Sequence, residues 1–140
     1  KIERLIKNTK IFLTVKDINF SIKGGRVPKY KGYIAKLLNM HPVLTTNEDG
    51  ELKAASAFFG KNNLHEKLAQ YVIGTLDKNL FYKFSVSHSN SPHEGEQLVD
   101  YIQSNFKNVV NIDLVDMGSG LGVHAGPGSF GLAHQLVYNE

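Results

Sequence analysis

Cysteine is absent from the sequence, which excludes disulfides and any zinc or iron–sulfur site held by thiolates. Long apolar runs are absent as well, since no stretch approaches the roughly 18 residues that are needed to span a bilayer. Residues 1–9 are charged and amphipathic, so they do not form the apolar core of a signal peptide. These features fit a cytoplasmic protein without a transmembrane segment, which is what we expect.

Charge of one sign is not strongly in excess. The formal net charge is only +3, and the lysines are scattered along the chain. A nucleic-acid surface usually needs a stronger basic face together with aromatic platforms or a known reading motif. We therefore do not expect nucleic acid as a partner.

The length and composition are those of one globular domain. The chain has 140 residues, of which 41% are hydrophobic and 21% are charged, enough to bury a core. It contains no internal repeat or low-complexity linker, so residues 1–140 are treated as a single domain. The chain begins at Lys1 rather than at a methionine, which suggests a domain cut from a longer protein.

Hydrophobic periodicity predicts alternating helices and strands. The expected helices cover residues 2–10, 17–22, 28–38, 61–76 and 94–106. The expected strands cover residues 11–15, 41–46, 51–58, 81–86, 109–115 and 132–138. The third helix is predicted to bury Ile34, Leu37 and Leu38, and the strand at 109–115 is predicted to be buried. This order predicts an α/β fold of two layers, with a mixed sheet of about six strands covered by helices on one face.

Glycine is concentrated near the end of the chain, with six glycines in the fourteen residues 118–131. Such a backbone can turn sharply and approach a ligand closely, above all at Gly126 and Gly128. His124 lies inside this segment, where its ring could donate to a carboxylate or another oxyanion. The alternative is a tight connection between two strands, with His124 hydrogen-bonded locally.

Other enzymatic motifs are incomplete. Gly118, Gly120 and Gly122 give G-x-G-x-G rather than the G-x-G-x-x-G of dinucleotide-binding folds, and no phosphate-binding loop is present. His93-Glu94 lacks the second histidine of a zinc-binding H-E-x-x-H motif. We therefore expect no cofactor, no metal site and no catalytic residue. A phosphate- or metal-dependent enzyme domain that uses the segment around His124 is kept as the alternative function.

Arg26 is the second candidate binding residue because it follows two glycines, Gly24 and Gly25. An irregular backbone could aim its guanidinium into a crevice, where it would pair with a carboxylate or a phosphate. The alternative is a solvated arginine beyond the end of a helix, in a position that the helix dipole favours.

Two motifs about a hundred residues apart, in this order, resemble the DegV family. They are Ile22-Lys23-Gly24-Gly25-Arg26-Val27 with its continuation from Gly32 to Leu44, and Leu121-Gly122-Val123-His124-Ala125-Gly126-Pro127-Gly128-Ser129-Phe130-Gly131-Leu132-Ala133. The Gly50-Glu51-Leu52 hairpin and the following helix also fall where the family pattern expects them. The resemblance covers essentially the whole chain and identifies it with the C-terminal domain of the family, without the N-terminal domain.

The resemblance implies a non-catalytic lipid carrier. Proteins of this family bind one long-chain fatty acid between two domains and present its carboxylate to a separate fatty acid kinase, which makes acyl-phosphate for phospholipid synthesis in bacteria. Carried over, His124 and Arg26 would lie at the carboxylate end of the lipid, next to Gly126 and Gly128. Ile34 and Phe130 would line the acyl tunnel, although an ordinary core position is the usual fate of such residues.

The sequence departs from the family pattern in two places. The family often carries several basic residues at the end of the second hairpin strand, and these are implicated in kinase docking. Here only Lys61 remains charged in that stretch, so it is the one candidate docking residue. Pro28 also stands where a small polar residue is usual. Acyl chain length, unsaturation and oligomeric state are not encoded in any motif of the chain.

Overall fold

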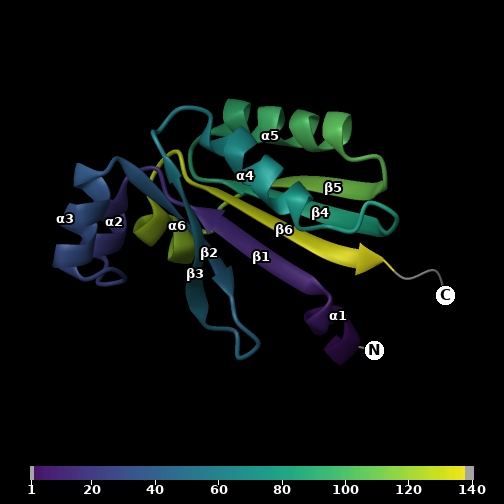
Figure 1. The fold of residues 1–140 in the computed structure, drawn as a ribbon, viewed down its shortest axis with the longest axis horizontal. Coiled ribbons are helices and arrows are strands. Elements are labelled where there is room, and N and C mark those ends of the chain that lie inside the picture. The colour runs from purple at the N-terminus through teal and green to yellow at the C-terminus, as the bar shows by residue number, and fades with distance from the viewer. Residues whose placement is uncertain (1, 138–140) are drawn as a thin grey trace.

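A computed structural model describes residues 2–137 of the chain, and Figure 1 shows their arrangement as a ribbon. The helices are α1 (Ile2–Lys7), α2 (Ile18–Lys23), α3 (Lys29–Leu37), α4 (Leu64–Gly74), α5 (Pro92–Asn105) and α6 (Ser119–Ala125). The strands are β1 (Thr9–Thr14), β2 (Met40–Thr46), β3 (Leu52–Phe59), β4 (Phe81–His88), β5 (Val109–Asp116) and β6 (Phe130–Val137). Lys1 and residues 138–140 lie outside the described residues, among them Tyr138 of the last predicted strand.

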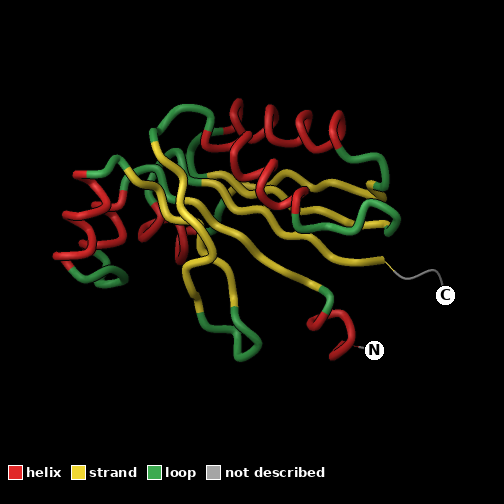
Figure 2. The backbone as a smooth tube through the Cα atoms, in the orientation of Figure 1, coloured by secondary structure: helices red, strands yellow, loops and turns green. Residues whose placement is uncertain are grey.

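The six strands form one mixed sheet in the order β3-β2-β1-β6-β4-β5. Only β4 and β5 pair in parallel, and α5 makes the crossover between them, whereas the other neighbours are antiparallel. Helices α4 and α5 cover one face of the sheet, and α2, α3 and α6 gather at one end (Figures 1 and 2). The predicted two-layer α/β fold is therefore confirmed. None of the described helices is long and apolar enough to cross a membrane.

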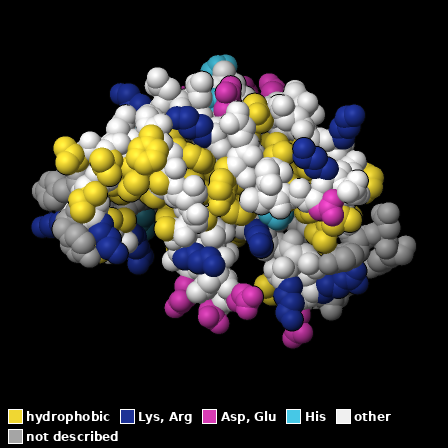
Figure 3. Space-filling model, viewed as in Figure 1, with side chains coloured by type: hydrophobic (Ala, Val, Ile, Leu, Met, Phe, Trp, Pro, Cys, Tyr) yellow, Lys and Arg dark blue, Asp and Glu magenta, His cyan; other side chains and the backbone are white. Residues whose placement is uncertain are grey.

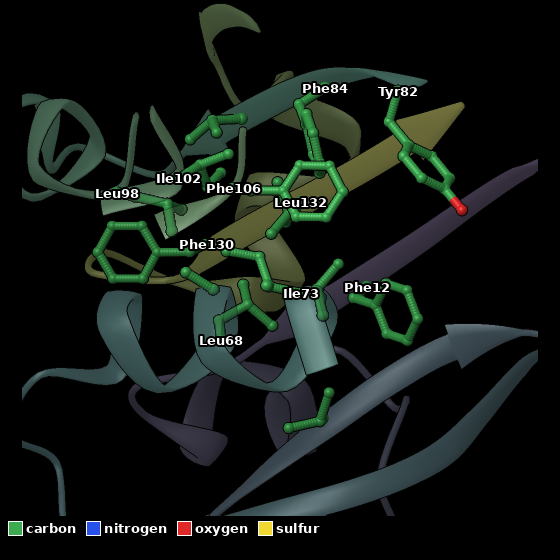
Figure 4. Close-up of a cluster of buried hydrophobic side chains, with 14 residues drawn as sticks. Phe12, Leu68, Ile73, Tyr82, Phe84, Leu98, Ile102, Phe106, Phe130 and Leu132 are labelled. Atoms are coloured by element: carbon green, nitrogen blue, oxygen red, sulfur yellow. The ribbon is translucent and has the colours of Figure 1, made fainter. Parts of the chain in front are cut away.

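The core lies between this face of the sheet and the pair α4 and α5. Alternate residues of the central strands point inward, as Tyr82, Phe84 and Val86 do on β4. They meet Leu68 and Val72 of α4 together with residues of α5. Figure 4 shows Leu68, Phe84 and Leu98 among the side chains of this core. Because a fully buried side chain of this size contributes about 1.5–3 kcal/mol, this layer holds the sheet and the two helices together.

Local sequence signals explain several boundaries. The side chain of Asp17 caps α2 by accepting from the Asn19 amide at 2.9 Å. The helix ends at Gly24, and Gly25 continues with a φ of 70°, which glycine adopts without strain. Proline opens α5 at Pro92, where its missing N–H costs nothing.

The glycine-rich segment differs from the prediction, because residues 119–125 form helix α6 rather than a loop. Positive φ values occur only after the helix, at Gly126 and Gly128. Helix α6 packs against α2, and this tertiary contact outweighs the low helix propensity of its glycines. The segment is therefore a helix followed by a tight turn, and the turn alone uses the conformational freedom of glycine.

Two burial predictions were wrong. The strand predicted to be buried is β5, and most of its side chains are exposed because it lies at the edge of the sheet with only β4 as a neighbour. Ile34 and Leu37 of α3 and the following Leu38 are exposed, whereas Ala35 is buried. Gly32 lies against Ile22 of α2, so α3 meets α2 at a small residue while these three apolar side chains stay outside.

Candidate functional site

The junction of α2 and α6 places His124. The side chain of Gly24 is a hydrogen atom, and an added Cβ there would collide with Nδ1 of the His124 ring. The hydroxyl of Ser21, one turn earlier on α2, donates to the His124 carbonyl at 2.8 Å. Ser21 is buried, so this bond lies out of solvent and ties the end of α6 to α2. Ser21 therefore fixes the backbone that carries His124, and Gly24 leaves the space that the imidazole occupies.

The burial of Nδ1 determines how the His124 ring can act. Nδ1 is buried and has no hydrogen-bond partner among the described residues, while the ring as a whole is half-buried. A buried Nδ1 cannot reach a ligand, so Nε2 is the ring nitrogen that can face one. The opposite edge of the ring is then left to donate an Nε2–H to a ligand such as a carboxylate.

The turn after α6 is held by backbone and hydroxyl contacts. The Gly128 amide donates to Ser89 O at 2.8 Å, and the Ser89 amide donates to Ser129 O at 3.0 Å. The buried Ser129 hydroxyl donates to Ala125 O at 2.7 Å and accepts from the Lys16 amide at 3.3 Å. This turn is therefore joined to the ends of β1 and β4.

Gly126 and Gly128 both have backbone conformations in this turn that favour glycine. Their φ values are 77° and 76°, which L side chains rarely adopt. A Cβ at Gly126 would collide with the Phe20 ring of α2, whereas one at Gly128 would meet the flexible end of the Lys16 side chain, which can move aside. Both glycines thus serve the conformation of the turn, whether or not they also approach a ligand.

Arg26 lies two residues beyond Gly24, on the exposed stretch between α2 and α3. Its backbone amide donates to Ser21 O at 2.8 Å, so Ser21 links the backbone of Arg26 to the carbonyl of His124. The structure therefore brings the two motifs of the sequence together at the α2–α6 junction. The Arg26 side chain is exposed, and its guanidinium is available to an anionic group.

The remaining candidate residues lie in different surroundings. The side chain of Ile34 is 54% exposed on α3, on the outer surface near this end of the molecule. Phe130 is only 3% exposed, and its ring packs in the core, edge-on to the His65 ring at 5.9 Å between centroids. Lys61 is exposed just after β3. Among the described residues, no three histidine, aspartate or glutamate side chains converge as a metal site would require.

Ser21 and Gly24 are positioning residues that the sequence did not reveal. Gly24 is recognisable as a helix terminator. Its packing against the His124 ring is a contact between residues that are 100 positions apart in the sequence. The bond from Ser21 to His124 likewise joins residues 103 positions apart. Local sequence carries no signal for either contact, since both arise only when α2 meets α6.

Comparison with known proteins connects this geometry to a family. The DegV family model, described as "Uncharacterised protein, DegV family", matches residues 1–136. Two DegV domain-containing proteins of Clostridium acetobutylicum are 29% and 30% identical to the chain, over 94% and 98% of its length. These alignments cover only 46% and 47% of the relatives, so the chain spans about half the length of the proteins it matches.

Solved structures show the same fold. A fatty acid binding DegV family protein of Streptococcus agalactiae superposes with a TM-score of 0.76 at 26% identity, covering 99% of this chain and 48% of that one. A Thermotoga maritima protein described by its fatty acid binding function gives 0.74 at 23% identity, covering 97% and 46%. The fatty acid kinase (Fak) B3 protein of Streptococcus pneumoniae, loaded with linoleic acid, gives 0.72 at 20% identity, covering 94% and 46%. The chain belongs to the DegV family.

Proposed function

We propose that this chain is the C-terminal part of a fatty-acid carrier, in which it encloses a long-chain fatty acid together with an N-terminal domain. The observation that carries the proposal is the fixed His124 ring, whose Nδ1 edge is buried against Gly24 and whose other edge remains to donate. The family of the chain and the fatty acids named for its structural relatives support this choice of ligand.

The chemistry of a fatty acid matches the two kinds of surface at this end of the molecule. Its carboxylate needs a few donors that fix its orientation, and the Nε2–H of His124 and the guanidinium of Arg26 are suitable. Its acyl chain contributes about 0.8 kcal/mol for each methylene that is buried. Ile34 on α3 offers an apolar wall, and Phe130 backs the turn from inside the core.

The exposed apolar side chains of α3 support a covering domain. Ile34, Leu37 and Leu38 are 54%, 87% and 53% exposed, and Figure 3 shows hydrophobic side chains gathered toward the end where α2 and α3 lie. Exposed apolar patches of this kind mark interaction surfaces. This chain matches about half of each relative. We assign the other half, an N-terminal domain, as the partner that covers this surface and the bound lipid.

In this proposal the carrier is cytoplasmic, needs no cofactor and is not an enzyme. It presents the acyl carboxylate to a separate fatty acid kinase for phospholipid metabolism. The exposed Lys61 after β3 is the residue that we assign to kinase docking. The kinase would supply the phosphoryl-transfer machinery, and the carrier would hold the nucleophilic carboxylate in place.

Mass spectrometry of extracted lipid tests the proposal. The longer protein, purified from a bacterial host, should yield about one fatty acid per molecule, and the 140-residue chain should yield little, because apolar burial is then shared between domains. His124→Ala and Arg26→Ala in the longer protein should lower lipid content or acyl-phosphate formation with a kinase. Lys107→Ala, an exposed basic residue after α5, is the control. Unchanged lipid and acyl-phosphate formation in both variants would reject these site residues, and a lipid-free longer protein would reject the ligand.

A further inference from the structure

An open cavity lies beside α1, and Figure 1 shows that this helix is at the opposite end of the molecule from α2 and α3. The cavity has a volume of about 210 Å³ and is bordered by α1, β1, the C-terminal end of α4, β4 and β6. It is lined by Lys7, Asn8, Lys10, Thr75, Leu76, Tyr82, His134 and Leu136. Neither His124 nor Arg26 takes part, so the cavity is separate from the proposed lipid site.

His134 is the unusual residue of this cavity. Its side chain is only 7% exposed, and neither ring nitrogen has a hydrogen-bond partner among the described residues. The ring stacks on Phe12, with 6.0 Å between centroids and 20° between planes, and it lies edge-on to Tyr82 at 5.6 Å. An apolar aromatic residue would satisfy these ring contacts without burying two unpaired nitrogens. The packing therefore gives no reason for a histidine here.

The two charged side chains that line the cavity, among the described residues, are both lysines. Lys10 is its direct neighbour across the β1–β6 pairing, and Lys7 lines the same cavity. No aspartate or glutamate is among the described residues that line it. Burial, and then the positive charge of Lys10, lower the pKa of His134 to about 4. The imidazole is therefore neutral near pH 7 and keeps one N–H donor in either tautomer.

We propose that this cavity binds a small oxyanion, of the phosphate or carboxylate class, between Lys7, Lys10 and an N–H of His134. Two ammonium groups would supply the charge, and the imidazole would supply a directional donor that is otherwise unpaired. The volume is below the roughly 300–1,000 Å³ of sites for drug-sized ligands, which suits a small ion rather than an acyl chain. Both ring nitrogens are buried, so the ion reaches the ring when the flexible stem of the exposed Lys10 swings outward, and the Lys10 ammonium then contacts the bound ion from the solvent side.

Nuclear magnetic resonance of the 15N-labelled 140-residue chain tests the site, with sodium phosphate as the probe at pH 7 and constant ionic strength. Phosphate should cause saturable shifts of the backbone amides of Lys7, Lys10 and His134. It should also raise the pKa of the His134 ring by about one unit, because an anion next to the ring favours the imidazolium. Saturable shifts of the same amides with acetate would identify a carboxylate site. Saturable shifts with glycerol phosphate would show that the ligand is a phosphate monoester rather than the free ion. Equal shifts with chloride would overturn the proposal.

Two variants and a control locate the ion. Lys10→Gln should weaken phosphate binding at least about tenfold, since it removes a charge-assisted contact. His134→Phe should keep the fold and abolish the saturable shifts of the neighbouring amides. Lys83→Gln is the matched control, because Lys83 is exposed on β4 and its side chain alternates with Tyr82 and Phe84 to the other face of the sheet. Binding that is unchanged in Lys10→Gln, or lowered equally in Lys83→Gln, would contradict the assignment.

Discussion

Gly24 at the end of α2 lies directly against the imidazole of His124 at the end of α6, so closely that no Cβ fits between them. The two residues belong to the two sequence motifs, which are about a hundred positions apart. The glycine is therefore conformationally ordinary, with a φ of −76°, and is needed for space rather than for backbone freedom. This separates Gly24 from the glycines of the turn after α6.

Gly24→Ala should displace the His124 ring and lower the free energy of unfolding by about 1–3 kcal/mol, the usual cost of overpacking. Denaturant unfolding of the 140-residue chain measures the change. Gly120→Ala is the matched control, because Gly120 lies in α6 with no atom near its added Cβ. The control should raise stability by roughly 0.5–1 kcal/mol through helix propensity. Equal effects of the two variants would contradict the packing of His124 on Gly24.

Gly126 and Gly50 compare a crowded turn with an open one. Both have positive φ values, 77° and 82°, but a Cβ at Gly126 would meet the Phe20 ring, whereas one at Gly50 would meet nothing. Gly50→Ala should therefore cost about 1 kcal/mol, from backbone conformation alone. Gly126→Ala should cost about 1–3 kcal/mol more, because its ψ of 168° completes a conformation that is essentially confined to glycine and because the Phe20 ring must also move. Thermal or denaturant unfolding compares the two variants, and similar losses would contradict this account of the turn.

His134 makes the stability of the chain depend on pH. Its pKa is lowered to about 4 in the folded state, by burial first and then by Lys10. In the unfolded chain the His134 imidazole takes up a proton near pH 6.5, whereas in the folded chain it stays neutral down to about pH 4. Stability is therefore greatest above pH 6.5 and falls as the pH drops toward 4. The full loss is about 3 kcal/mol. The pKa of His65 is also lowered, mainly by burial, and adds to the same trend.

His134→Phe should remove most of this pH dependence and keep the aromatic packing against Phe12 and Tyr82. Unfolding free energies measured from pH 7 to pH 4, at low anion concentration, give the two slopes. The variant should be at least as stable as the original at pH 7, since it buries no unpaired nitrogen. A slope that stays the same would assign the pH dependence to His65 or to other groups.

The order of strands and helices could be read from the sequence, because hydrophobic periodicity is a local property of each segment. The exposure of β5 could not, because an edge position depends on which strands pair, and the apolar residues of β5 look like those of a central strand. Helix α6 was missed because its glycines disfavour a helix, and its packing against α2 is not local.

The two motifs of the candidate site could be recognised in the sequence. The contacts between them could not be predicted from it. His124 and Arg26 stand out because each lies near glycines. Ser21 does not stand out, although its hydroxyl is the group that joins α2 to the His124 carbonyl. No sequence motif marks His134 as a binding residue either. Its surroundings combine Lys7 and Lys10 from the start of the chain with Thr75 from the middle.

Leu37 tests whether the apolar side of α3 serves another domain. It is 87% exposed, so Leu37→Lys should change the unfolding free energy of the 140-residue chain by no more than about 0.5 kcal/mol. In the longer protein the same change would place a charge against the covering domain, so lipid content by mass spectrometry should fall. Leu52→Lys is the control, because Leu52 is 59% exposed on β3 and lies outside the candidate site. Equal lipid content in both variants would mean that α3 faces solvent in the longer protein and that its exposed leucines have no partner there.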